Sequence, residues 1–459
     1  MNTTPKYRLT DETIEYNGRT LHRIEALRDF GDVKAGDKGG FVQSEDNLSH
    51  QSDNLLDLGD CWIYNDAKVY DNAQVLGNAK VYDNAQVFGN AHVIDKAEVF
   101  GYAQVYDDAI VGYCAQVYEN AQVFGNAQVF DSAQVFGNAK VNDNAKVNDN
   151  AKVYDNANIN NSAQVYDKAK VYGNAVLYHN VQVYDNAKVY DNAQIAFESQ
   201  IFNNAQVYGN ALVSENAKVY GNAKVYDNAN LFGNLILPNC CLKVYDNAEI
   251  FGNAIIDVAP NQNSVMEIFG NAKIYGNAEV VGCNIKIYEN AKVFDSVSVG
   301  DNANIYNEAQ VFGNAKILRN AKVFGKAQVF EKAHLLGHTK VYGNAKVHGD
   351  VRIFGNSNVC EDVFDNARIY KGVYISDKML ADLENNNIIC VNGLIDDNYK
   401  SYKGFLRLTD GKFEDISVEK FEEMKRKKQE QSKQQDTLKA PAENQNEIKQ
   451  NKPKRGFKI

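Results

Sequence analysis

Residues 79–96 read AKVYDNAQVFGNAHVIDK, and this stretch decides the fold because its six-residue phrase recurs from about Ile63 to about Ile375. The phase is strict from Ile63 to Leu237, where Val, Ile or Leu falls on every sixth residue. Small apolar and polar residues alternate within each phrase, as a β-strand requires when successive side chains point to opposite faces. Ala and Val are therefore predicted to point inward, Lys or Gln and Tyr or Phe outward, and Asp-Asn or Gly-Asn to form a turn.

Each phrase predicts one short strand and one corner, and such strands bury a core only by stacking on one another. Three phrases then make a triangular coil of 18 residues, so the predicted fold is all-β: a single-stranded parallel β-helix with a cap at each end. About 53 phrases give 17 to 18 coils and a rod of roughly 80 Å. An α-helix is excluded because Gly, Asn or Asp every six residues would break it. Residues 239–242 and 281–286 predict slips in the repeat, and residues 257–267 a small loop.

Val81 followed by Ala85, or Val123 followed by Ala127, places a small residue four positions after an aliphatic one. This spacing resembles the hexapeptide repeat of the left-handed β-helix superfamily, and the resemblance implies left-handed winding. The general rule for β-crossovers favours the right hand. The periodicity by itself decides neither.

A more specific resemblance lies before the repeat and at its start, in residues 26–36 (ALRDFGDVKAG), 39–42 (GGFV) and 59–64 (GDCWIY). These stretches resemble the start of the YdcK-type proteins, bacterial hexapeptide-repeat proteins to which an acyltransferase activity is attributed. Enzymes of that superfamily, the resemblance implies, use a His as general base and bind acyl-CoA beside loops that leave the coils. The resemblance also implies trimers.

The two ends of the chain lack the repeat and predict further parts. Asn17-Gly18 between two alternating stretches predicts a β-hairpin, and a cap there would cover the open edge of the first coil. The predicted parts are residues 1–60 as the N-terminal cap with this hairpin, 61–376 as the β-helix, 377–416 as a C-terminal cap, 417–428 as a short helix and 429–459 as a disordered tail.

The composition limits the compartment and the partners. The chain has 459 residues, a net charge of −10 and seven scattered cysteines without a CxxC pair, which predicts reduced thiols and a cytoplasmic protein. No apolar signal segment or run of about 18 apolar residues occurs, so no membrane partner is predicted. The acidic body disfavours nucleic acid, which needs positive charge. Only the tail from Glu419 onward, with twelve basic and seven acidic residues, suits nucleic acid or an acidic partner.

Stacking places residue i above residue i+18, and one resulting column of outward aromatic side chains has no gap. The predicted binding residues are Tyr64, Tyr82, Phe100, Tyr118, Phe136, Tyr154, Tyr172, Tyr190, Tyr208 and Tyr226. If the slip near residue 240 is a one-residue bulge, a second column takes over, with Phe232, Phe251, Phe269, Tyr288, Tyr306, Phe324 and Tyr342.

Two interpretations of the aromatic column stay open. Stacked aromatic rings stabilise a sheet by about 0.2–1 kcal/mol per pair, so the column can be structural. A strip this long also exceeds the apolar surface that a monomer normally leaves in water, which predicts a second copy, another protein or a polysaccharide as partner. The leading hypothesis is a non-catalytic, rod-like structural or binding protein that presents the column to a partner or to itself, without a cofactor.

The alternative hypothesis is a hexapeptide-repeat acyltransferase that uses acyl-CoA and a small hydroxyl or amine acceptor. A general base is then needed, and the candidates are His334 and His348, which are predicted to share one face of adjacent coils with His338 nearby. No metal-ligand spacing appears, so no metal is predicted. Stabilisation by acetyl-coenzyme A would favour the enzyme, whereas bundles that form with rising concentration would favour the scaffold.

Overall fold

The structure is a computed structural model that describes residues 5–50, 59–237, 239–261, 264–365, 367–385, 387–396, 400–409 and 412–437. The chain divides into two compact units after Gly372. The first unit contains the six-residue repeat and the second contains the C-terminal segments.

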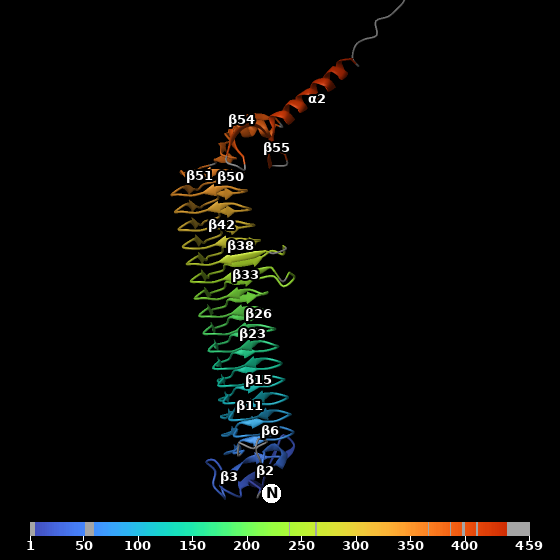
Figure 1. The fold of residues 1–459 in the computed structure, drawn as a ribbon, viewed down its shortest axis with the longest axis vertical. Helices are drawn as coiled ribbons and strands as arrows, with labels where there is room; N and C mark the ends of the chain where they lie inside the picture. The colour runs from blue at the N-terminus through green and yellow to red at the C-terminus, as the bar shows by residue number, and fades with distance from the viewer. Residues whose placement is uncertain are drawn as a thin grey trace, which may run out of the picture. The chain divides into compact units, whose positions relative to one another are not determined.

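The first unit is a parallel β-solenoid (Figure 1). Each strand of the strict repeat pairs in parallel with the strand one coil before it and the strand one coil after it. Lys152, for example, lies opposite Gln134 and Lys170, each 18 residues away along the chain. About 17 coils stack in this way, which confirms the coil length predicted from the sequence.

Every coil contributes one strand to each of three faces, named here in chain order. Face 1 consists of β4 (Trp62–Ile63), β7 (Lys80–Val81), β10 (Glu98–Val99), β13 (Gln116–Val117), β16 (Gln134–Val135), β19 (Lys152–Val153), β22 (Lys170–Val171), β25 (Lys188–Val189), β28 (Gln206–Val207), β31 (Lys224–Val225), β34 (Glu249–Ile250), β37 (Lys273–Ile274), β40 (Lys292–Val293), β43 (Gln310–Val311), β46 (Gln328–Val329) and β49 (Lys346–Val347). Face 2 consists of β5 (Lys68–Val69), β8 (Gln86–Val87), β11 (Gln104–Val105), β14 (Gln122–Val123), β17 (Lys140–Val141), β20 (Asn158–Ile159), β23 (Val176–Tyr178), β26 (Gln194–Ala196), β29 (Leu212–Ser214), β32 (Asn230–Phe232), β35 (Ile255–Val258), β38 (Glu279–Gly282), β41 (Ser298–Val299), β44 (Lys316–Ile317), β47 (His334–Leu335), β50 (Arg352–Phe354) and β52 (Arg368–Tyr370). Face 3 consists of β6 (Gln74–Val75), β9 (His92–Val93), β12 (Ile110–Val111), β15 (Gln128–Val129), β18 (Lys146–Val147), β21 (Gln164–Val165), β24 (Gln182–Val183), β27 (Gln200–Ile201), β30 (Lys218–Val219), β33 (Cys241–Val244), β36 (Val265–Ile268), β39 (Lys286–Ile287), β42 (Asn304–Ile305), β45 (Lys322–Val323), β48 (Lys340–Val341) and β51 (Asn358–Val359).

The interior of the solenoid is lined by the Val and Ala positions of the repeat. Ala151 and Val153 have no exposed surface, and the equivalent residues of the other coils are buried in the same way. The outward side chains of the same strands stay partly exposed. This alternation is the inside–outside pattern predicted from the sequence, and the narrow interior suits small aliphatic side chains.

The corners are built by residues that tolerate a left-handed backbone. Asp155, with φ 57°, is one of a series of Asp, Asn and Gly residues at such positions. The carboxylate of Asp155 accepts a hydrogen bond from the backbone N–H of Gly173, one coil later, at 3.1 Å. The Asn156 amide beside it donates to the side-chain oxygen of Asn174 at 3.0 Å. Each corner therefore fastens two successive coils to each other.

The N-terminal cap starts with the predicted hairpin. Strands β1 (Tyr7–Tyr16) and β2 (Arg19–Ala26) pair antiparallel around Asn17 and Gly18, which have φ 49° and 75°. Strand β3 (Lys38–Val42) pairs with β2 and, in parallel, with β5, and a 3-10 turn η1 (Glu45–Asn47) follows. The cap thereby covers the edge of face 2, where unpaired backbone groups would otherwise remain.

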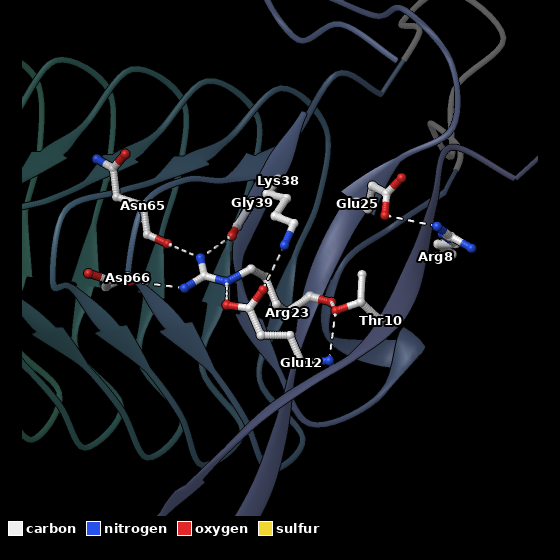
Figure 2. A network of polar contacts seen from close by, with 9 residues as sticks. All are labelled: Arg8, Thr10, Glu12, Arg23, Glu25, Lys38, Gly39, Asn65 and Asp66. Atoms are coloured by element: carbon white, nitrogen blue, oxygen red, sulfur yellow. Dashed lines mark hydrogen bonds and ion pairs between the residues drawn. The ribbon is translucent and has the colours of Figure 1, made fainter. Parts of the chain in front are cut away.

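Polar and aromatic contacts attach the cap to the first coil. The Arg23 guanidinium donates hydrogen bonds to the carbonyl oxygens of Gly39 at 2.9 Å and Asn65 at 3.1 Å, and it pairs with Asp66 at 3.3 Å (Figure 2). The ring of Trp62, which is 1% exposed, packs edge-on against Phe30 with ring centroids 5.3 Å apart. The cap and the first coil thus share one core.

The second unit contains a three-stranded antiparallel sheet and two helices. Its elements are β53 (Val373–Tyr374), α1 (Asp377–Glu384), β54 (Ile389–Ile395), β55 (Ser401–Thr409), β56 (Lys412–Ile416) and α2 (Val418–Thr437). Helix α2 continues nine residues past residue 428, where the sequence prediction ended it, and so includes part of the segment predicted to be disordered. The remainder of that predicted tail, residues 438–459, lies outside the described residues.

Candidate functional site

The aromatic column predicted on face 1 is present. From Tyr82 to Tyr226 each ring lies nearly parallel to the next one; Tyr154 and Tyr172, for example, have centroids 4.8 Å apart and ring planes within 1°. Tyr64 begins the column with an edge-on contact to Tyr82, at a centroid distance of 6.5 Å. The ten predicted residues therefore form one continuous column.

The predicted continuation of this column is wrong. Tyr226 stacks on Phe251 with centroids 4.8 Å apart, whereas Phe232 lies on face 2 opposite Asp257. The prediction assumed a one-residue bulge, but 25 residues separate Lys224 from its partner Glu249. The face 1 column continues with Phe251, Tyr275, Phe294, Phe312, Phe330, His348 and Phe364.

Face 3 carries a second stacked column that the sequence reasoning missed. It takes in five of the residues that had been assigned to the predicted continuation, and it begins much earlier in the chain. Its members are Tyr166, Tyr184, Phe202, Tyr220, Tyr245, Phe269, Tyr288, Tyr306, Phe324 and Tyr342. The aromatic residues at every sixth position were the available signal, but assigning them to faces required the true lengths of the insertions.

The stacking decides which part of each ring faces outward. Because neighbouring rings are parallel and in contact, the two flat sides of a ring inside the column are covered by its neighbours. The ring edges and, for Tyr, the hydroxyl groups are what the column presents. A ligand that stacks on an exposed ring face would find such faces covered along most of the column.

Alkaline pH is expected to weaken the columns. Burial, followed by the neighbouring Tyr208 and Tyr172, raises the pKa of Tyr190 to about 12, against about 10 for an unfolded chain. The fold therefore favours the neutral phenol. Its stabilising effect is fully present below about pH 10 and is lost as the pH rises through about 12.

A titration followed by the ultraviolet absorbance of phenolate should show a group of Tyr residues that ionise late and together with loss of β-sheet circular dichroism. Tyr190→Phe should remove one such late-ionising group without changing the others. Ionisation of all Tyr residues near pH 10 in a protein that keeps its native spectrum would contradict this expectation.

The two candidate catalytic histidines do not come together. His334 belongs to β47 on face 2 and lies opposite Lys316 and Arg352. His348 stacks on Phe330 in the face 1 column, with centroids 4.7 Å apart. The prediction that they share one face is wrong because 14 positions separate them, whereas one coil takes 18. His338 lies at the corner after β47 and joins neither in a hydrogen bond that involves described residues.

The repeat is interrupted at one corner, between faces 2 and 3, in three successive coils. The spacing between paired residues grows to 25 from Asn230 to Ile255, to 24 from Ile255 to Glu279 and to 19 from Glu279 to Ser298. The first slip predicted from the sequence is thus a full loop after β32, and the loop predicted around residues 257–267 follows β35. Figure 1 shows both loops projecting beside β33 and β38.

Apolar side chains are exposed at this corner. Ile236 in the first loop is 79% exposed and Leu235 is 43% exposed. On the same corner in an earlier coil, Phe197 is 37% exposed and stacks on His179 with centroids 4.2 Å apart. On face 2 beside the loops, burial raises the pKa of the Asp257 carboxyl. This corner is the part of the solenoid surface that departs most from the repeat.

Comparison with known proteins gives one match. Residues 205–221 match the model of the YdcK beta solenoid repeat. This segment spans β28, β29 and β30, which is one complete coil. No curated protein matches the chain.

Two further observations concern the setting of the protein. All seven cysteines are free thiols, and Cys61, Cys240 and Cys283 are buried. Within the described ranges, none of the helices has both the length and the apolar character needed to cross a bilayer.

Proposed function

We propose that this β-solenoid protein, with a coil similar to the YdcK beta solenoid repeat, is a non-catalytic structural rod that docks through the face 1 aromatic column. The observation that carries the proposal is the continuity of that column from Tyr64 to Phe364. Face 3 starts its own stacked column only at Tyr166, and on face 2 positions such as Asn142 and Asn160 replace the rings. A continuous apolar strip along one face suits lateral docking.

A protein surface suits this column better than a polysaccharide or a nucleic acid. Sugars and bases pack on exposed ring faces, and here the neighbouring rings cover those faces. Nucleic acid also requires positive charge, whereas the chain has a net charge of −10. Ring edges and Tyr hydroxyl groups pack readily against another protein.

The partner that the geometry favours is a second copy of the chain. A second copy has the same spacing from coil to coil, so contacts made in one coil repeat in the next. On face 1 a cation such as Lys188 lies two residues before the ring of Tyr190, and Asp191 lies one residue after it. A two-fold axis parallel to the rods sets ring against ring and each Lys column near the partner's Asp corner. Antiparallel rods would instead set Lys against Lys.

Self-association is expected to depend on the rings of face 1. Replacing Tyr118, Tyr154 and Tyr190 together with Ser removes three rings while leaving the interior unchanged. Sedimentation velocity over a range of concentrations should show reversible dimers or larger bundles for the wild type and monomers for this triple variant.

The matched control replaces Tyr166, Tyr184 and Tyr220 with Ser. These residues stack in the same geometry on face 3, so the control loses similar stacking energy without altering face 1. It should associate as the wild type does. A wild-type protein that stays monomeric throughout, or equal loss in both triple variants, would contradict docking through face 1.

An acyltransferase activity is the second candidate, and the interrupted corner is the observation that favours it. Its two loops are the places in the described solenoid where a pocket could be built beside the coils. Neither His334 nor His348 belongs to these coils, whereas His179 lies on the same corner, in the coil of β23. Acetyl-coenzyme A should raise the Tm only if this second candidate is correct.

A further inference from the structure

The arginines of the solenoid have an unusual distribution. Between residues 61 and 372 the repeat uses Lys as its basic residue, and Arg occurs at Arg319, Arg352 and Arg368 alone. All three lie near the C-terminal end of the solenoid, on face 2 or at the corner that follows it. Arg differs from Lys in presenting a planar group that can hold a carboxylate through two hydrogen bonds.

These arginines belong to a column of cationic and His side chains. Lys316 lies opposite His334, His334 lies opposite Arg352, and Arg352 lies opposite Arg368, in four successive strands of face 2. Like charges placed directly opposite each other destabilise a sheet. An arrangement of this kind is more stable when an anion lies across it.

The adjacent corner does not supply that anion. Lower coils have Asp71, Asp107 and Asp143 at the first corner position after face 2, whereas this part of the solenoid has Arg319 there, with φ 64°. The carboxylate of Asp350 reaches Arg352 at 3.5 Å, which balances one charge of the column. The pKa of His334 is lowered by burial and by the neighbouring Lys316 and Arg352, consistent with an excess of positive charge.

A second, apolar column lies beside the first. Two residues further along the same strands and their ends are Leu318, Leu336, Phe354 and Tyr370, all partly exposed. Leu318 and Leu336 replace the aromatic residues of the repeat, and both columns extend over the same coils. Together the two columns make a surface with one cationic and one apolar edge, named here the basic strip.

We propose that the basic strip binds an acidic, amphipathic peptide segment of a partner protein. Carboxylates would pair with Arg352, Arg368 and Arg319, while apolar side chains of the same segment would cover Leu318 and Leu336. Charge complementarity selects an anionic partner, and the apolar column selects a peptide over a polyphosphate chain. Nucleic acid fits less well because four strands span only about 15 Å and the rest of the body is acidic.

The test measures binding of a fluorescently labelled peptide with repeating Glu-Glu-Leu-Leu to the full-length protein by anisotropy. The variant Arg319→Gln/Arg352→Gln removes two exposed cations of the strip and should raise the Kd about tenfold or more. Rising salt should weaken wild-type binding. A peptide with Lys in place of Glu should not bind.

The matched control is Lys152→Gln/Lys170→Gln, which removes two cations stacked in register on face 1. Its Kd for the peptide should equal that of the wild type. The proposal would be overturned if the wild type fails to bind the peptide, if both double variants lose affinity equally, or if a labelled oligothymidine binds the strip more tightly than the peptide does. The single variant Arg352→Gln repeats the measurement should the double variant fold poorly.

Discussion

Replacing Val153 with Asp is expected to lower the free energy of unfolding by roughly 3–5 kcal/mol, the cost of an uncompensated buried charge. Val153 has no exposed surface and lies in register between Val135 and Val171. The interior around it is lined by Val and Ala, which offer no hydrogen-bond donor to a carboxylate. Urea denaturation followed by circular dichroism measures the change.

The control is the preceding residue on the same strand. Lys152 points outward, so Lys152→Asp should change the free energy of unfolding by no more than about 0.5 kcal/mol. Hydrogen exchange should locate the loss of protection in Val153→Asp in the coils on either side of β19, because each coil contacts only its neighbours. If both variants unfold at the wild-type urea concentration, the inward assignment of the Val positions is wrong.

Replacing Trp62 with Ala is expected to cost about 3–5 kcal/mol and to detach the N-terminal cap. Trp62 is 1% exposed and packs against Phe30 and Tyr7, with ring centroids 5.3 and 6.2 Å away. A Cβ added at Gly39 would come within 2.7 Å of its ring, which shows how closely β3 approaches it. Removing the indole therefore leaves a cavity that the cap can fill only by moving.

Hydrogen exchange of β1 to β3 should show the detachment, and differential scanning calorimetry should show a lower first transition. Trp62→Phe keeps most of the aromatic contact and should cost clearly less. Trp62 is the one tryptophan of the chain, so the wild-type fluorescence on heating reports the same event independently. Unchanged exchange of the cap strands in Trp62→Ala would show that the cap is held by other contacts, such as those of Arg23.

Much of the fold could be predicted because every phrase of the repeat contains both of its structural instructions. Ala151 and Val153 define the inward face of a strand, and Asp155 and Asn156 define the following corner, with side chains that suit a left-handed backbone. Repetition then fixes the register, since one misplaced residue would turn every inward side chain outward. The column from Tyr64 to Tyr226 follows from that register alone.

The parts that could not be predicted depend on lengths that leave no local mark. Residues 233–237 keep the spacing of the repeat through Leu237, yet they leave the coil, so the break seemed to start only near residue 240. Counting backward from Val244 and Ile250, which resume the inward series, would have placed Phe251 above Tyr226. Helix α2 continues past residue 428 through residues rich in Gln and Lys, whose helix propensity is good although their apolar pattern is weak.

The hydrogen bonds between corners have a consequence for how such a chain can change in length. Asn156 bonds to Asn174, and Asn174 bonds to Asn192, in the same way at each step. A coil added or removed as a whole therefore leaves both new neighbours with matching partners, and the end-to-end distance changes by about 4.8 Å. The molecule is in this sense a ruler graduated in coils, whose reach genetic duplication can adjust without redesigning any contact.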